Sequence, residues 1–198
     1  MPPLPPPPAK PEPGKRSSAA AGGAETTTLG VDDSASSAVL RLSAIDIATV
    51  RALLSRYGLV IEIVADDTPI PGSYWGECEA GVIGNVVHAR ADTPVHSLLH
   101  EACHLIVAPA DKRERIHTDA SDSQAEEDAT CYLQIVLADV LSGVGAARLC
   151  EDMDRWGYTF RLGSARAWFE RDAEDARAWL IARGLLVGET AAKTSSAR

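Results

Sequence analysis

Long apolar segments are missing from this sequence of 198 residues. No stretch approaches the roughly 20 apolar residues that a membrane-spanning helix requires. The N-terminus, which begins Met1-Pro2-Pro3, also lacks the hydrophobic core of a secretory signal. These absences predict a soluble, cytoplasmic protein that has no membrane partner.

Paired cysteine motifs and clusters of positive charge are missing as well. The formal net charge is −9 and no long basic run occurs, whereas phosphate binding needs clustered Lys and Arg. Nucleic acid is therefore not expected as a partner. The cysteines show no C-x-x-C spacing and are expected to be reduced, buried thiols. They are Cys78, Cys103, Cys131 and Cys150.

The composition supports one folded domain with two tails. Hydrophobic residues make up 45% of the chain, which is enough to bury one substantial core. Residues 1–37 are rich in Pro, Ala, Gly, Ser and Thr and have no apolar periodicity, so they are predicted to be a disordered tail. An alternative role for their polyproline run is docking on an SH3-like groove. The domain is expected over 38–187, and a second tail over 188–198.

The most informative stretch is the H-E-x-x-H motif formed by residues 100–104. Residues four apart lie on one face of a helix, so His100 and His104 can hold one ion, with Glu101 beside them. A zinc ion lowers the pKa of a coordinated water to about 7, and a neighbouring carboxylate can accept its proton as the water attacks a carbonyl carbon. The motif predicts a zinc centre with Glu101 as the general base.

The surroundings of the motif predict an amphipathic helix over about 94–107. Thr93 suits the N-cap and Pro94 the first helical position, while Pro109 ends the segment. An apolar stripe follows helical spacing, and the two histidines fall to one side of it. It consists of Val95, Leu98, Leu99, Ala102 and Ile106.

A catalytic zinc site usually has a third protein ligand. The metzincin arrangement requires glycine and histidine three and six residues after the second histidine, and this chain has Val107 and Ala110 there. That class is excluded.

The next helix, capped by Asp122 or Ser123 and ended by Gly143, offers Glu126 instead. Glu126 continues an inward-facing apolar stripe, whereas Glu127 is expected to be rotated away. The stripe consists of Ala129, Tyr132, Leu133, Val136 and Val140.

The motif and the E-x-x-A sequence at 126–129 together resemble the gluzincin plan, especially the compact minigluzincin and ImmA/IrrE-like metallopeptidases. The resemblance covers residues 43–142. It implies that the motif histidines and Glu126 bind zinc and that Glu101 is the catalytic base of a peptidase. Thr130 stands where these families usually have Asn or Asp to orient a ligand histidine, and is a candidate for that role.

The expected fold class is α+β, in the form of a small zincin-like domain. A short sheet would pack on the H-E-x-x-H helix and on the glutamate-bearing helix, after a first helix capped by Ser43 and stopped by Gly58. Segments 59–64 and 82–90 are rich in β-branched residues and predict two strands. The resemblance implies that a peptide or protein substrate lies along the 82–90 strand as an extra strand.

The region 147–187 is expected to add helices over about 147–155 and 165–183, the latter capped by Ser164 and ended by Gly184. The second helix carries an apolar stripe predicted to pack against the catalytic core or a second subunit. It consists of Phe169, Ala173, Ala176 and Leu180.

Several residues remain candidates for supporting roles. His96 is excluded as a third histidine ligand, because it lies about 12 Å from His104 along a helix axis. His117 is a candidate ligand or oxyanion donor in the loop 110–122, and His88 is a candidate for facing the cleft. The other possible oxyanion donors are Tyr74, Tyr132 and Tyr158.

Two alternatives to a peptidase stay open. One is a catalytically inactive, zinc-stabilised regulatory or partner-binding protein with a zincin-like fold, because such a scaffold can persist without turnover. The other keeps zinc-dependent hydrolysis but directs it at a non-peptide amide.

Overall fold

The computed structural model describes residues 38–74, 76, 78–113, 115–117 and 123–187. The chain divides into two units, Met1–Ala38 and Val39–Arg198. The tails expected over 1–37 and 188–198 lie outside the described residues. Within the described part the fold is α+β, with seven α-helices and one three-stranded sheet. Its helices include none with the length and apolar character needed to cross a membrane.

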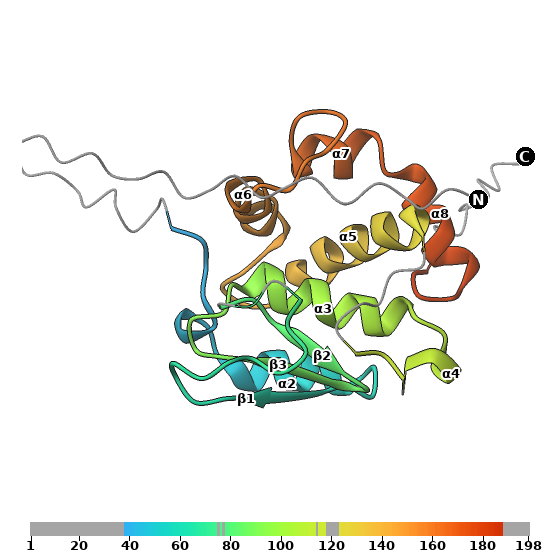
Figure 1. The fold of residues 1–198 in the computed structure, drawn as a ribbon. Helices are drawn as coiled ribbons and strands as arrows, with labels where there is room; N and C mark the ends of the chain where they lie inside the picture. Colours follow the sequence, from blue (N-terminus) through green and yellow to red (C-terminus); the bar gives the residue numbers. More distant parts are fainter. Residues whose placement is uncertain (1–37, 75, 77, 114, 118–122, 188–198) are drawn as a thin grey trace, which may run out of the picture. The chain divides into compact units, whose positions relative to one another are not determined.

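Figure 1 shows the elements, which follow one another along the chain in a simple order. They are η1 (Leu42–Ala44), α2 (Ile47–Ser55), β1 (Val60–Ile63), β2 (Gly81–Ile83), β3 (Val86–Ala89), α3 (Val95–Val107), α4 (Ala110–Arg113), α5 (Gln124–Asp139), α6 (Ala146–Trp156), α7 (Ala165–Arg171) and α8 (Glu174–Ala182).

The first long helix starts later than expected. Ser43 lies in the short 3-10 helix η1, and Asp46 caps α2 by accepting a hydrogen bond from the backbone N–H of Ala48. Aspartate accepts such a bond as readily as serine, so the helix begins at the cap that stands directly before its apolar residues.

The sheet has the strand order β1-β3-β2. The single strand expected over 82–90 is wrong, because Gly84 and Asn85 form a turn and the segment becomes the hairpin of β2 and β3. Gly84 has a φ of +61°, which glycine adopts without strain. The central strand β3 pairs in parallel with β1 and antiparallel with β2. Both edges of β3 are therefore occupied.

Helix α3 lies between the sheet and α5 (Figure 1). Its residues are all buried except His100 and Glu101, which keep partial exposure. The predicted helix is confirmed at 95–107, although Pro94 occupies the N-cap position instead of the first helical position. The partly open part of α3 thus coincides with the start of the H-E-x-x-H motif.

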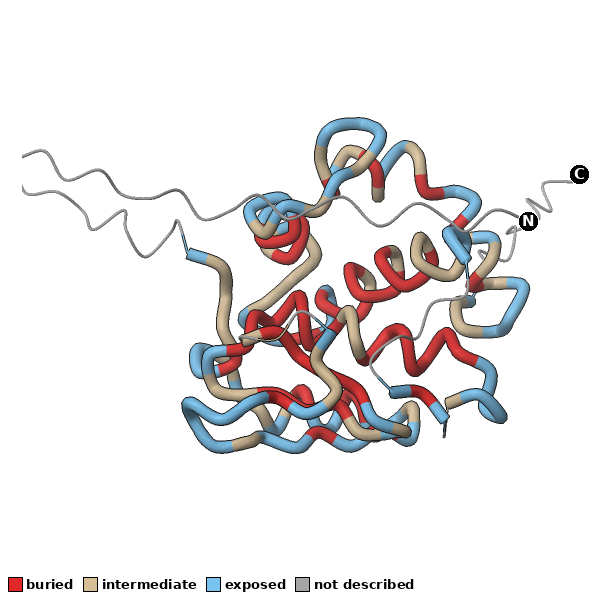
Figure 2. The backbone as a smooth tube through the Cα atoms, in the orientation of Figure 1, coloured by how far each residue is buried: buried red, intermediate tan, exposed pale blue. Residues whose placement is uncertain are grey.

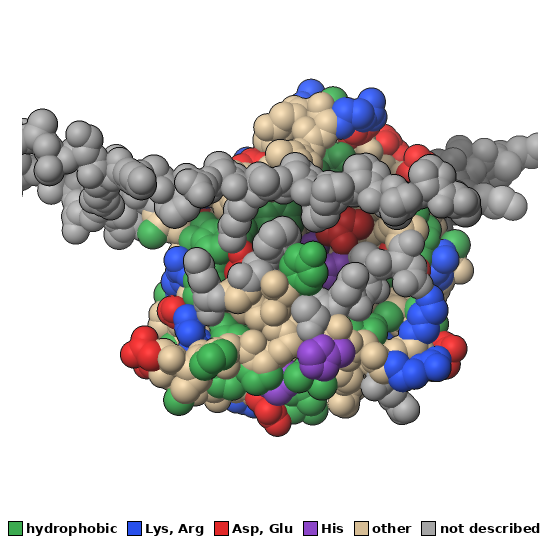
Figure 3. Space-filling model, in the orientation of Figure 1, with side chains coloured by type: hydrophobic (Ala, Val, Ile, Leu, Met, Phe, Trp, Pro, Cys, Tyr) green, Lys and Arg blue, Asp and Glu red, His purple; other side chains and the backbone are tan. Residues whose placement is uncertain are grey.

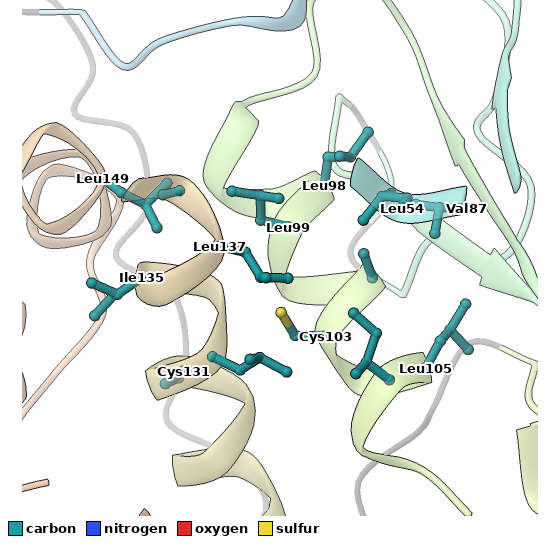
Figure 4. Packing of buried hydrophobic residues seen from close by; sticks show 14 of the residues in the cluster. Leu54, Val87, Leu98, Leu99, Cys103, Leu105, Cys131, Ile135, Leu137 and Leu149 are labelled. Carbon is teal, nitrogen blue, oxygen red and sulfur yellow. The ribbon is translucent and has the colours of Figure 1, made fainter. Parts of the chain in front are cut away.

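The core joins α3 to the helices that follow it. Figure 4 shows Leu99 of α3, Leu137 of α5 and Leu149 of α6 meeting in one apolar cluster. Helices α3 and α5 are buried over much of their length in Figure 2. Dense packing of this kind fixes the rotation of α5 relative to α3, and so decides which α5 side chains face the motif.

The long C-terminal helix expected over 165–183 is two helices. Ser164 caps α7 as predicted, accepting from the backbone N–H of Ala167. The helix stops before Asp172, whose carboxylate is bound by Arg161, and α8 begins at Glu174. Helix α8 contacts α5, so this part packs against the core of its own chain.

Candidate metal centre

The two histidines of the motif meet on one face of α3. Their Nε2 atoms lie 3.0 Å apart, and their ring centroids are 4.5 Å apart. Two nitrogens that each bind a zinc ion at about 2.0–2.1 Å come within about 4 Å of each other. The pair can therefore share one ion.

The third candidate ligand is Glu127, not Glu126. The carboxylate oxygens of Glu127 lie 3.3 Å from Nε2 of His100 and 3.6 Å from Nε2 of His104. The ligand atoms of these three residues all lie within 4.8 Å of one another, and Glu126 is not part of the group. The structure therefore brings Glu127, and not the predicted Glu126, together with the two histidines.

The physical reason lies in the rotation of α5. Ala129 and Leu133 of the predicted apolar stripe are buried, but the two histidines contact a different face of α5. The face turned toward α3 carries Thr130, Cys131 and Gln134, which are all buried. At 100° per residue these side chains cluster around the direction of Glu127, about 100° away from that of Glu126.

Both motif histidines contact side chains of this α5 face. Nδ1 of His100 lies 3.0 Å from Oε1 of Gln134, and Nδ1 of His104 lies 3.4 Å from Oγ1 of Thr130. The amide nitrogen of Gln134 donates to the sulfur of Met153 at 2.9 Å, so its oxygen faces His100. An Nδ1–H of His100 can donate to this oxygen, and Nε2 is the nitrogen directed at His104 and Glu127.

The electrostatics of the pair favour a neutral ligand. Burial and the adjacent His100 lower the pKa of His104. Burial acts in the same direction on His100, but Tyr158, Cys131 and Glu127 outweigh it and raise the pKa of that imidazole. Two imidazoles whose Nε2 atoms lie 3.0 Å apart cannot both be positively charged imidazolium ions at low cost. At least one therefore stays neutral, which is the form that binds a metal.

Among the three candidate tyrosines, Tyr158 lies at the site. Its ring contacts the ring of His100 edge-on at 5.7 Å, and its hydroxyl interacts electrostatically with Glu101 and Glu127. Burial raises the pKa of this hydroxyl, which keeps it protonated and able to donate. Tyr132 instead packs on Phe169 at 4.7 Å between ring centroids.

The other tyrosine and the remaining histidines lie elsewhere. Tyr74 is 57% exposed and His117 is exposed, its backbone bridging to Ile83. His88 lies on β3 with Nδ1 3.4 Å from a carboxylate oxygen of Glu62. His96 is buried against the rings of Trp156 and Tyr158. None of these residues belongs to the His/Glu group found among the described residues.

The sheet edge next to β2 is already used by the protein's own backbone. The N–H of Val82 donates to the carbonyl of Gly72 at 3.3 Å, and the N–H of Gly84 donates to the carbonyl of Ile116 at 2.9 Å. Because β3 is also paired on both sides, the strand expected to receive a substrate has no open edge in the described part of the chain.

The donor set suits zinc. Two imidazoles and one carboxylate are a known ligand set of catalytic zinc sites, and here both outer nitrogens have hydrogen-bonding partners. Gln134 was missed from the sequence, although its position seven residues after Glu127 places both on one helix face.

No family model matches the chain, and no curated protein or solved structure matches it.

Proposed function

We propose that this protein is a zinc-dependent peptidase in which His100, His104 and Glu127 hold the ion. The observation that carries the proposal is the convergence of three ligand atoms within 4.8 Å. It is supported by Glu101, which precedes the buried part of the motif and keeps partial exposure. A structural site needs no such carboxylate beside it, whereas hydrolysis needs a base.

Each residue has a defined task in this proposal. A zinc ion held by the three ligands would polarise a carbonyl group and lower the pKa of water to about 7. Glu101 accepts the proton that the attacking water loses, and passes it to the leaving amine. Gln134 and Thr130 hold the imidazoles in the orientation that directs Nε2 inward.

Tyr158 is the proposed donor to the oxyanion. Its ring packs edge-on against the ring of His100 at 5.7 Å between centroids, and burial raises the pKa of its hydroxyl and keeps it protonated. A hydroxyl in that position can donate a hydrogen bond to the carbonyl oxygen as negative charge develops there. Because the β2 edge is occupied, the substrate is expected to bind mainly through its side chains.

Metal content tests the ligand assignment, with Glu126 as the matched control. Purified wild type and the variants His100→Ala, Glu127→Ala and Glu126→Ala are analysed by plasma mass spectrometry. About one zinc per chain is expected in wild type and in Glu126→Ala, with loss in the other two variants. Loss of zinc in Glu126→Ala and retention of zinc in Glu127→Ala would favour Glu126 as the third ligand, as predicted from the sequence. A wild type that is folded but contains no metal would contradict the proposal.

Hydrolysis tests the base. Glu101→Gln should keep the metal and cleave a peptide library at least about 100-fold more slowly than wild type. Equal cleavage rates would remove Glu101 from the mechanism. A zinc-loaded wild type that cleaves neither peptides nor other amides would favour the zinc-stabilised regulatory protein.

A further inference from the structure

A buried histidine lies next to the proposed ligands and has no task in the mechanism above. His96 precedes His100 by one helical turn on α3, so the two side chains project from the same face of the helix. Figure 3 shows histidine side chains at the molecular surface, whereas His96 is only 1% exposed. His96 is also outside the group of candidate ligand atoms. Its role must therefore follow from what its ring contacts inside the core.

The ring of Tyr158 lies against His96 as well as against His100. Each distance between ring centroids is 5.7 Å, and the ring planes meet at 87° for His96 and at 82° for His100. Edge-to-face contacts with centroids about 4.5–7 Å apart are favoured between aromatic rings. Two residues one turn apart are separated by about 6 Å along the helix axis. The phenol ring thus has two imidazole supports, placed one turn apart on α3.

His96 also contacts an indole ring that is itself held in place. Trp156, at the end of α6, lies 5.1 Å from His96 between ring centroids. Its indole N–H donates to a carboxylate oxygen of the buried Glu79 at 3.1 Å, and the guanidinium of Arg41 lies over its ring at 5.7 Å. Hydrogen bonds to carboxylates are stronger than those between neutral groups. The indole therefore limits how far His96 can shift away from Tyr158.

The backbone of Tyr158 is fixed separately, at the end of α6. Gly157 has a φ of +99°, and its N–H donates to the carbonyl of Asp154 at 3.2 Å. The N–H of Tyr158 donates to the carbonyl of Met153 at 3.1 Å. These two bonds form the Schellman arrangement that ends a helix at glycine. Rotation of the side chain remains to be fixed in Tyr158, and the imidazole of His96 limits that rotation.

We propose that His96 is a positioning residue, which holds the phenol of Tyr158 in the orientation needed at the metal centre. This inference rests on the proposed function and on the oxyanion role of Tyr158. A donor to the oxyanion acts from about 2.7–3.1 Å, so a small rotation of the ring removes most of its effect. His96 acts through its ring contacts, and neither binds the ion nor exchanges a proton with the substrate. Its loss should therefore lower kcat while zinc content and KM stay the same.

A double-mutant cycle with Tyr158→Phe tests this role in the full chain. His96→Leu and His96→Gln are made in wild type and in Tyr158→Phe, and kcat, KM and zinc content are measured with one peptide that wild type cleaves. In the wild-type background each substitution is expected to lower kcat about 10-fold to 100-fold at unchanged KM. In the Tyr158→Phe background each should change kcat less than about twofold, because no hydroxyl is left to position.

Two further variants complete the experiment. His88→Gln is the matched control, because His88 is a buried histidine of β3 outside the candidate ligand group, and its kcat and KM should equal those of wild type. Trp156→Phe leaves His96 in place but removes the N–H that donates to Glu79. It should also lower kcat, by a smaller factor than the His96 variants, and again only when Tyr158 is present. This variant keeps the test decisive where the His96 variants do not fold.

Each failure has its own signature. A fall in kcat by the same factor in both backgrounds, or no fall in the wild-type background, overturns the positioning role. Loss of zinc from folded His96 variants also overturns it, because His96 would then support the ligands. A wild type that binds no zinc, or that binds zinc without cleaving peptides, overturns the proposed function and the positioning role together.

Discussion

Tyr158 and Tyr132 allow the oxyanion role to be tested with a matched pair of substitutions. Tyr158→Phe removes the hydroxyl that interacts with Glu101 and Glu127, so kcat for peptide hydrolysis should fall about 100-fold to 1000-fold with little change in KM. Tyr132→Phe should leave both constants unchanged, since that ring packs on Phe169. A fall in kcat for Tyr132→Phe alone would reverse the two assignments.

Gln134 fixes the imidazole of His100, and its removal should weaken metal binding. Gln134→Leu is expected to lower zinc affinity about 10-fold to 100-fold, because Nδ1 of His100 loses the acceptor 3.0 Å away. Competition with a coloured chelator measures the change. Gln124→Leu is the control, because Gln124 is exposed at the start of α5 and its amide donates to the carboxylate of Asp128. Equal affinity in both variants would show that the orienting bond is unimportant.

At this scale the sequence predicted that the two motif histidines lie together on one helix face, but it did not predict that Glu127 lies beside them. The spacing of His100 and His104 is set within one helix, so local periodicity places both on one face. Glu127 faces them only because α5 packs at a particular rotation. Nearly every side of α5 is buried, so an apolar stripe cannot identify the side that faces α3.

Among the elements, the turn before β2 makes a prediction about stability. A side chain at Gly81 would place Cβ 2.2 Å from the backbone nitrogen of Ser73 and 2.3 Å from the carbonyl oxygen of Pro71. Gly81→Ala should lower the free energy of unfolding by about 3 kcal/mol. Gly58→Ala meets no atom within 4 Å and should cost about 1–2 kcal/mol for its positive φ.

Urea unfolding followed by circular dichroism compares the two glycine variants. A smaller loss of stability for Gly81→Ala than for Gly58→Ala would mean that the 71–73 turn moves away freely. Zinc content should be unchanged in both, since neither glycine contacts the three ligands.

Element order was predicted better than element boundaries. The helix at 95–107 and the cap at Ser123 follow from residues that act locally. The hairpin of β2 and β3 was missed because Gly84 and Asn85 interrupt a run of β-branched residues that otherwise reads as one strand. The break between α7 and α8 depends on Asp172 and its distant partner Arg161, which no local pattern indicates.

For the whole molecule, metal removal should lower stability. A ligand present at 100 times its Kd adds about 2.7 kcal/mol to the folded state. For a domain of this size that corresponds to a fall in Tm of about 5–10 °C on adding a chelator. Glu127→Ala should show no change with chelator, which separates loss of the bound ion from general effects. A wild-type Tm that does not respond to chelator would argue against a bound metal.

The α+β class of the molecule followed from its order of helices and strands, and the structure agrees at that level. Contacts between segments distant in sequence were beyond local patterns. The ring of Tyr158 reaches His100 from a position 58 residues further along, after α6. Such a contact forms only when α6 packs against α3, so it depends on the folded core.

For the proposed peptidase, the occupied edge of β2 also determines which kind of inhibitor would bind. Extended peptide mimics gain much of their affinity by adding a strand to an open sheet edge. Here the carbonyl groups of Gly72 and Ile116 already accept hydrogen bonds from backbone N–H groups at that edge. Such compounds would therefore form few backbone hydrogen bonds with it. Compact chelating groups that reach the two imidazoles directly should make the better lead compounds.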